Sequence, residues 1–228
     1  MTAPQEGPLN PLPPVVWLLA LPVIAMETVL FLADRGLVGG AAGIGWRLQA
    51  IERFAFAPSI LGWMWDTGRW GAENLARTVL YVFVQASFTQ ALFVVVFLLA
   101  LGKMVAEVFR PLAVLTLWLG ASAGGALIYA LVAGRDAPIL VGGYPAVYGL
   151  IGGFTFLLWV RLGIAGANRY RAFSLIGVLM GIRLLFGILF DGGPDWIADL
   201  AGFCVGFVLS FVLVPGGFSQ VLARLRSR

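Results

Sequence analysis

Long apolar runs separated by short polar connections dominate this chain. Each of six runs is close to the ~20 residues that a helix needs to cross a bilayer. The predicted spans are residues 14–33, 79–101, 111–133, 144–162, 172–190 and 196–214. The pattern therefore predicts an all-α membrane protein with a six-helix transmembrane domain over residues 14–214. A Pro-rich N-terminal tail over residues 1–13 and a basic C-terminal tail over residues 215–228 complete the expected organisation.

One connection is much longer than the others. Residues 34–73 carry charges of both signs and four of the eight tryptophans. A loop of this length without any structure of its own is uncommon in a compact domain. Residues 51–56 and 60–65 have the composition of short helices that lie in the membrane interface. We therefore expect a partly helical interfacial loop between the first and second spans.

The composition narrows the function classes. The chain of 228 residues is 61% hydrophobic and only 11% charged, whereas a soluble domain is about 25% charged. It contains no His and a single Cys, Cys204, which excludes His-based acid–base chemistry, His metal ligands and an intrachain disulfide. No cofactor or metal is expected. The net charge of +4 comes with Arg residues at helix ends rather than in a patch, so nucleic acid is not an expected partner.

Basic side chains gather on one set of connections. With a cytoplasmic N-terminus, the inner connections and the C-terminal tail carry Lys103, Arg110, Arg161, Arg169, Arg171, Arg224, Arg226 and Arg228. The short outer connections carry Arg135 with Asp136, and Asp191 with Asp195. This asymmetry follows the positive-inside rule. We therefore expect both termini in the cytoplasm.

Small residues mark the predicted helix contacts. Gly149 and Gly153 are four residues apart on one face of the fourth span. On the sixth span, small residues recur every four positions at Ala198, Gly202, Gly206 and Ser210. These two faces are predicted to pack with little separation between their backbones. Gly120, Gly124 and Gly125 give the third span a similar face. Such stripes are common in tight bundles and carry no functional weight alone.

A glycine-rich run over residues 141–153 resembles the active-site segment of rhomboid intramembrane proteases, Gly-x-Ser-Gly-x-x-x-Gly. Tyr144 stands at the position of the nucleophilic Ser, and Pro145 at that of the following Gly. Residues 198–206 resemble the family pattern Ala-His-Leu-Gly-Gly-x-x-x-Gly, with Asp199 at the position of the general-base His.

Two further segments carry the resemblance, which covers about residues 74–214. Arg77 matches the Arg of the family's Trp-Arg motif. Residues 83–94 resemble the pattern Phe-x-His-x-x-x-x-His-x-x-x-Asn, with Gln85 and Gln90 at the two His positions and Val94 at the Asn position. In active members the first His and the Asn support the oxyanion. Partial matches in the family's order imply a six-span rhomboid-like bundle.

The replaced residues do not reproduce the protease chemistry. A phenol ionises near pH ~10, so Tyr144 is a poor nucleophile. Asp199 does not take up and return a proton as imidazole does. Gln85 offers one oxyanion donor and Val94 offers none. We therefore interpret the chain as a pseudoprotease without catalytic residues.

The same positions form a predicted binding site of Tyr144, Asp199, Gln85 and Arg183. We hypothesise that the Tyr144 phenol donates a hydrogen bond to Asp199; alternatively, both groups face a water-filled cavity without a partner. Arg183 lies inside the fifth span and needs a partner. It pairs with Asp199, pairs with Glu27 of the first span, or extends outward to the interface. A charge cluster that only fixes helix register remains an alternative to a recognition site.

The resemblance implies recognition of transmembrane helices beside the second and fifth spans. We therefore predict a non-catalytic binder, adaptor or scaffold for transmembrane segments of other proteins, in a bacterial-type inner membrane. One alternative is a permanent accessory subunit of a larger membrane complex. Another is an intramembrane peptidase with unconventional catalysis. A small transporter or channel would need a continuous polar path, against which the apolar inner halves of the second to fourth spans argue.

Overall fold

The structure, a computed structural model, describes residues 12–189 and 192–214 apart from the side chain of Phe186. Six of its helical segments are long and apolar enough to cross a membrane. They are α1 (Pro14–Asp34), α6 (Phe88–Ala106), α7 (Pro111–Ala133), α8 (Tyr144–Ile164), α9 (Ser174–Leu189) together with the preceding 3-10 helix η2 (Arg169–Phe173), and α10 (Trp196–Leu213). This confirms the predicted all-α, six-span architecture. The expected tails, apart from residues 12–13, lie outside the described residues, as does Asp191.

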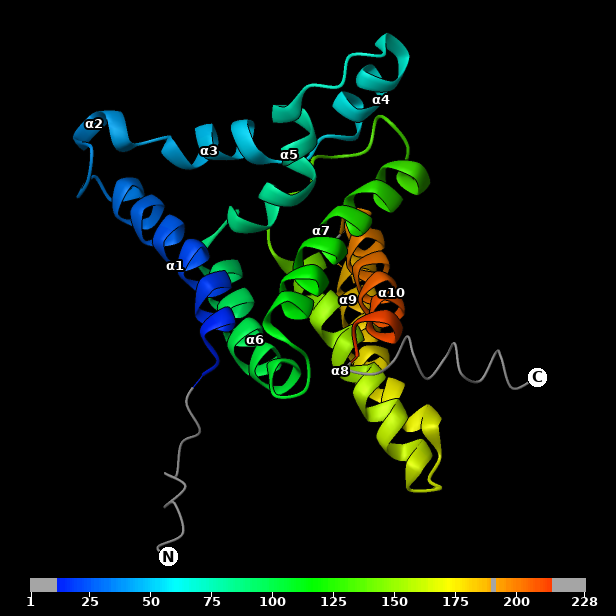
Figure 1. The fold of residues 1–228 in the computed structure, drawn as a ribbon. Helices are drawn as coiled ribbons and strands as arrows, with labels where there is room; N and C mark the ends of the chain where they lie inside the picture. Colours follow the sequence, from blue (N-terminus) through cyan, green and yellow to red (C-terminus); the bar gives the residue numbers. More distant parts are fainter. Residues whose placement is uncertain (1–11, 190–191, 215–228) are drawn as a thin grey trace, which may run out of the picture.

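The long connection after α1 is largely helical, as expected. It contains α2 (Gly40–Gly43), α3 (Trp46–Phe54), α4 (Pro58–Thr67) and α5 (Ala72–Leu80), which lie across one end of the bundle (Figure 1). An isolated antiparallel bridge joins this connection to the loop before α8. Its two hydrogen bonds run from Phe56 N to Leu140 O at 3.0 Å and from Leu140 N to Phe56 O at 2.8 Å. The connection is therefore tied directly to the segment that precedes Tyr144.

The second span begins at Phe88, so the prediction of a start at residue 79 is wrong. Residues 79–80 end α5, and Tyr81–Phe83 form the 3-10 helix η1. The chain is extended at Val84 and, after a bend, at Ser87, whose hydroxyl accepts a hydrogen bond from Gln90 N at 3.2 Å and caps α6. Tyr81 and Val82 are fully buried in the protein core. The apolar residues before α6 therefore pack inside the protein rather than extending the span.

The predicted contact between the fourth and sixth spans is confirmed. A methyl group on Gly206 would lie 2.7 Å from Gly149 Cα, and one on Gly202 would lie 2.9 Å from the carbonyl carbon of Pro145. Both distances are shorter than a side chain tolerates, so the glycines let α8 and α10 meet backbone to backbone. Gly152, which the predicted stripe does not include, approaches α10 equally closely, because a methyl group on it would lie 2.6 Å from Phe207 N.

The glycine face of α7 also packs against α10. A methyl group on Gly124 would lie 2.7 Å from Val205 Cγ2, and one on Gly125 would lie 2.9 Å from Ala198 O. Helices α7, α8 and α10 thus form the tightly packed part of the bundle. Because Tyr144 begins α8 and Asp199 lies in the first turn of α10, this packing brings the two positions to the same end of the molecule.

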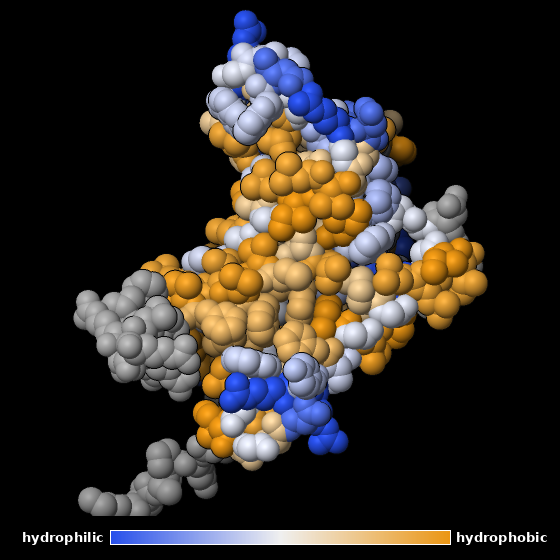
Figure 2. All heavy atoms as spheres, turned by 90° about the vertical axis from the view of Figure 1, so that its right-hand side faces the viewer, coloured by the Kyte–Doolittle hydropathy of each residue, from blue (hydrophilic) through white to orange (hydrophobic). Residues whose placement is uncertain are grey.

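Helix α9 is packed much less closely. Its main contacts are with η2 and α10, and a methyl group on Gly177 or Gly181 would meet no atom within 4 Å. Figure 2 shows a broad apolar belt on one face of the molecule, with hydrophilic residues gathered toward its two ends. That distribution is expected for a protein whose middle lies in hydrocarbon and whose ends meet water.

Candidate functional site

Tyr144 is the first residue of α8 and follows a loop that needs glycine. Gly142 has a φ of 106°, a conformation that residues with a side chain rarely adopt. A methyl group there would also lie 2.8 Å from Gln90 Cδ. Pro145 fits the first turn of α8, where a backbone N–H has no helical partner. The chain therefore reaches Tyr144 through a loop pressed against the side chains that precede and begin α6.

Gln85, at a predicted oxyanion position, is buried and holds this loop. Its Nε2 donates to Val82 O at 2.8 Å, and its Oε1 accepts from Gly143 N at 3.1 Å. The two backbone groups fix the orientation of the amide, because a carbonyl needs the NH2 and an N–H needs the oxygen. The side chain therefore links η1 to the loop before α8.

Gln90 and Val94 complete the support of the same loop. Gln90 Nε2 donates to Val141 O at 3.3 Å, and Oε1 of this residue accepts from Ala86 N at 2.9 Å. Val94 is fully buried, and its Cγ1 would lie 2.7 Å from a methyl group on Gly143. The two predicted oxyanion positions, Gln85 and Val94, and the neighbouring Gln90 thus all hold the loop before α8, two through amide hydrogen bonds and one through an apolar contact.

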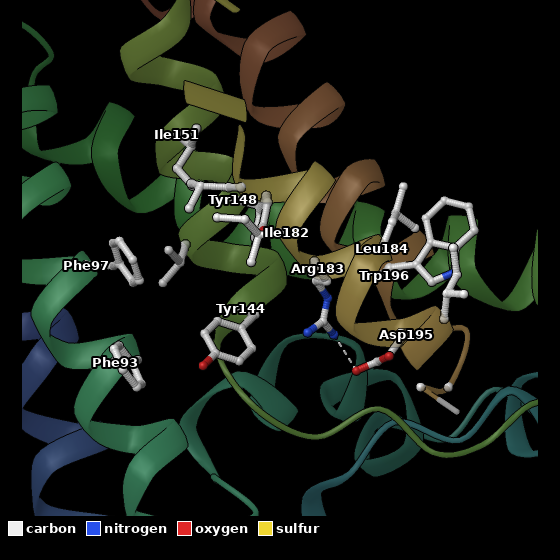
Figure 3. A pocket seen from close by; sticks show the side chains of 16 residues that line it. Phe93, Phe97, Tyr144, Tyr148, Ile151, Ile182, Arg183, Leu184, Asp195 and Trp196 are labelled. Atoms are coloured by element: carbon white, nitrogen blue, oxygen red, sulfur yellow. Dashed lines mark hydrogen bonds and ion pairs between the residues drawn. The ribbon is translucent and has the colours of Figure 1, made fainter. Parts of the chain in front are cut away.

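Arg183 joins two carboxylates at the start of α10. Its Nη2 lies 2.5 Å from Asp195 Oδ2 (Figure 3), and its Nε lies 2.6 Å from Asp199 Oδ2. The second contact is an ion pair without hydrogen-bond geometry. Asp199 is 2% exposed, whereas the Asp195 side chain is 54% exposed. Of the alternatives left by the sequence, the pairing of Arg183 with Asp199 is the one observed.

Tyr144 and Asp199 lie near one another but do not form the expected direct bond. Among the described residues, no hydrogen bond joins the Tyr144 hydroxyl to Asp199, whose Oδ2 has no hydrogen-bonding partner. The Arg183 guanidinium lies 5.8 Å from the centre of the Tyr144 ring, and the hydroxyl points away from it (Figure 3). The carboxylate therefore has a cation as its partner in place of the phenol.

Glu27 has a partner that the sequence analysis did not identify. Arg47 of α3 binds it through two hydrogen bonds, Nη2 to Oε1 at 2.8 Å and Nη1 to Oε2 at 2.9 Å. Arg47 also donates to Asp34 Oδ2 at 2.8 Å and to the backbone carbonyl of Gln85 at 3.0 Å. The hydrogen bond with Glu27 raises the pKa of Arg47 above its usual range. One guanidinium thus connects the interfacial loop, α1 and the segment before α6.

Arg77, which the sequence analysis matches to the Arg of the Trp-Arg motif, hydrogen-bonds backbone carbonyls of the interfacial connection. It donates from Nη1 to Glu52 O at 2.9 Å and to Ala55 O at 3.4 Å. These bonds hold α5 against the end of α3. Its role in the described structure is therefore to shape the interfacial connection.

A large cavity lies beside Tyr144, between α6, α8 and α9. Its volume is about 880 Å³. The residues labelled in Figure 3 that line it from these three helices are Phe93, Phe97, Tyr144, Tyr148, Ile151, Ile182, Arg183 and Leu184. Most of the wall is apolar, and the charged groups Arg183 and Asp195 gather at one end. The cavity therefore combines an apolar bed with one polar end.

The space next to Asp199 itself is far smaller. A second cavity of about 20 Å³ is lined by Asp199, Gln90, Tyr81 and the loop before α8. Roughly 10–15 Å³ is needed for one water molecule, so this space holds about one. Within residues 12–189 and 192–214, no group of three or more His, Cys, Asp or Glu residues is placed to hold a metal ion.

Comparison with known families agrees with this architecture. The Rhomboid domain family matches residues 72–216, more than half of the 228-residue chain. The chain belongs to the rhomboid family. The matched segment of this rhomboid runs from α5 through α10 and so contains Tyr144, Asp199 and both glutamines. No curated protein matches the chain. The family includes serine proteases; that Tyr144 and Asp199 stand at the positions of their catalytic pair stays a prediction from the sequence.

Proposed function

We propose that this rhomboid is non-catalytic and binds transmembrane segments of other membrane proteins in the cavity between α6, α8 and α9. The supporting observation is the cavity of about 880 Å³, whose walls are mostly apolar. An apolar partner helix in the cavity would make packing contacts with these walls that the loosely packed α9 does not make. Van der Waals packing of this kind is the main driving force for association of helices within a bilayer.

The geometry around Tyr144 supports the absence of proteolysis. A general base must reach the proton that it removes, directly or through one water. Asp199 is instead paired with Arg183 at 2.6 Å, and only about 20 Å³ of space adjoins it. The Asp199 carboxylate is therefore poorly placed to remove the proton of the Tyr144 phenol. Without that proton transfer, the phenol cannot attack a peptide bond as a nucleophile.

The oxyanion positions support the same proposal. Stabilising a tetrahedral intermediate requires free donors aimed at the developing negative charge. The Nε2 group of Gln85 already donates to Val82 O at 2.8 Å, and Val94 is apolar. The second N–H of that amide is the one donor left at these two positions, because Val94 supplies none.

For the location, we propose a bacterial-type inner membrane with both termini in the cytoplasm. The α6–α7 turn and the α8–η2 turn lie at the end of the bundle opposite α3 to α5 (Figure 1). In these two turns, or at the helix ends that flank them, lie Lys103, Arg110, Arg161 and Arg169. A cytoplasmic position for this basic end follows the positive-inside rule.

A binding measurement with designed helices tests the proposal. Purified protein and a fluorescently labelled single-span Leu/Ala peptide are reconstituted together in lipid vesicles, and energy transfer reports association. Ile182→Trp, which fills part of the cavity, is expected to weaken binding. Leu131→Trp places the same ring on an 82% exposed position of α7 outside the cavity and is expected to have no effect. Equal binding by both variants, or no binding by the wild type, contradicts the proposed site.

Natural partners are identified by placing a photoreactive amino acid at position 182 in native membranes. The adaptor function predicts several membrane proteins among the adducts, each reduced by excess Leu/Ala peptide. A single dominant adduct that also co-purifies in a fixed ratio would indicate an accessory subunit of one complex. The same photoreactive amino acid at position 131, outside the cavity, measures the background crosslinking for both outcomes.

A further inference from the structure

We propose that the polar end of the cavity selects transmembrane helices that carry a basic residue, Lys or Arg, near one end. This inference rests on the proposed helix-binding function and adds to it the chemistry of the partner. The observation that supports it is an imbalance of charge at the cavity, where one cation, Arg183, pairs with two carboxylates, Asp195 and Asp199.

The imbalance is visible in the pairing of Arg183. Its guanidinium contacts Asp195 Oδ2 at 2.5 Å and Asp199 Oδ2 at 2.6 Å. Asp199 is buried in the first turn of α10, where the positive end of the helix dipole also offsets its charge. Asp195 precedes the helix, is 54% exposed and shares its only described cation with Asp199. Because Asp199 is buried, Asp195 is the carboxylate whose remaining negative charge a partner in the cavity can reach.

The apolar surroundings of Asp195 strengthen its interaction with a charged partner. Asp195 lines the cavity together with apolar side chains that include Phe93, Ile182 and Leu184. Charges interact more strongly beside apolar walls than in water, because fewer water molecules screen them. A partner carrying an ammonium or guanidinium group gains an ion pair at Asp195. A partner carrying a carboxylate is repelled, so the site discriminates by sign of charge.

The position of the cluster defines where the basic residue must lie. Arg183 is six residues before Leu189, the last residue of α9, which corresponds to about 9 Å along the helix. Asp195 lies beyond that point, just before α10. The complementary cation therefore belongs within the last two turns of the partner helix, at the end of the bundle where α3 to α5 lie. A basic residue at the opposite end of the partner gains nothing from Asp195.

The test uses the vesicle assay with five single-span Leu/Ala peptides. One is wholly apolar; three carry Lys, Gln or Glu in the last two turns on the α5 side; the fifth carries Lys at the opposite end. The wild type is expected to bind the first Lys peptide about tenfold more tightly than the apolar one, equivalent to 1.4 kcal/mol. The Glu peptide should bind more weakly than the apolar peptide. The Gln peptide and the peptide with Lys at the opposite end should bind with about the same affinity as the apolar peptide.

Variants at Asp195 separate recognition from folding. Asp195→Asn leaves Arg183 and Asp199 as a balanced pair and is expected to reduce the Lys preference below about twofold. Asp195→Glu retains the charge and should retain the preference. Asp136→Asn removes an exposed carboxylate from the α7–α8 loop at the same end of the bundle, away from the cavity. This control should keep the preference near tenfold.

The outcomes distinguish this inference from the function on which it rests. Equal affinity of the wild type for the Lys and apolar peptides overturns the inference and leaves helix binding intact. A Lys preference that survives Asp195→Asn, or that appears equally with Lys at the opposite end, also overturns it. Failure of every peptide to bind contradicts the helix-binding function and the inference together.

Discussion

Replacing Gly206 by Ala is expected to separate α8 from α10 and destabilise the protein. The new methyl group would lie 2.7 Å from Gly149 Cα and closer still to the Gly149 carbonyl oxygen. Ordinary contacts of this kind begin at 3.4 Å, so the helices must move apart by about 0.7 Å or more at this point. Both neighbouring atoms belong to the backbone and cannot turn away as a side chain does.

The expected cost follows from the packing of that contact. Overpacking a close-packed interior costs about 1–3 kcal/mol, and the backbone contact here places the change at the upper end, near ~3 kcal/mol. Gly177→Ala in α9 is the matched control, because its methyl group would meet no atom within 4 Å. Alanine is the better helix former by about 1 kcal/mol in water, so the control should be neutral or slightly stabilising.

The assay is reversible unfolding of the purified protein in mixed micelles by increasing SDS, followed by tryptophan fluorescence and helical circular dichroism. The account predicts a lower free energy of unfolding for Gly206→Ala than for Gly177→Ala, with a difference of about 3 kcal/mol. Equal free energies for the two variants would refute the close backbone approach of α8 and α10. The shared location of Tyr144 and Asp199 would then lose its structural basis.

Three further predictions concern the hydrogen-bonded groups Gln85, Arg47 and Asp66. Gln85→Leu should cost about 2 kcal/mol, because it leaves Gly143 N and Val82 O without their side-chain partner, and should speed amide hydrogen exchange in the loop before α8; exposed Gln49→Leu should change neither. Arg47→Gln should cost about 3–5 kcal/mol by leaving buried Glu27 without its cation, and a double variant with Glu27→Gln should cost less than Arg47→Gln alone; additive costs in the same unfolding assay would contradict this. Arg135 of the α7–α8 loop donates hydrogen bonds to Asp66 of α4 and so lowers the pKa of Asp66. The stabilisation from these bonds is therefore present at neutral pH and lost as the pH falls through the lowered pKa, so wild type and Asp66→Asn should converge in stability only in acid; convergence near neutral pH would argue against the ion pair.

The six spans and their main contact could be predicted because both leave local signals. Apolar length identifies a span, and glycines four residues apart identify a helix face. The start of α6 could not be predicted in the same way. Apolar residues that face lipid and those buried in protein look alike in sequence, so the apolar pattern includes Tyr81 and Val82 in the span. Ser87 is the available signal, as a capping residue directly before α6.

The partners within the site depend on distances that no local pattern encodes. The family resemblance places Tyr144 and Asp199 near one another, and the structure agrees. The sequence leaves the pairing of Arg183 with Asp199 as one of three alternatives, and only the structure selects it. Likewise, Arg47 reaches Glu27 across 20 residues and the Gln85 carbonyl across 38, through the path of the interfacial loop. Such pairs follow from the fold, which must be known before they can be named.

The central claim is that this rhomboid retains the family architecture without its proteolytic chemistry. The most direct test incubates the purified protein in lipid vesicles with a single-span substrate helix and detects cleavage by mass spectrometry. The account predicts no product above that of empty vesicles. A product that the wild type forms, and that Tyr144→Phe or Asp199→Asn abolishes, would contradict it.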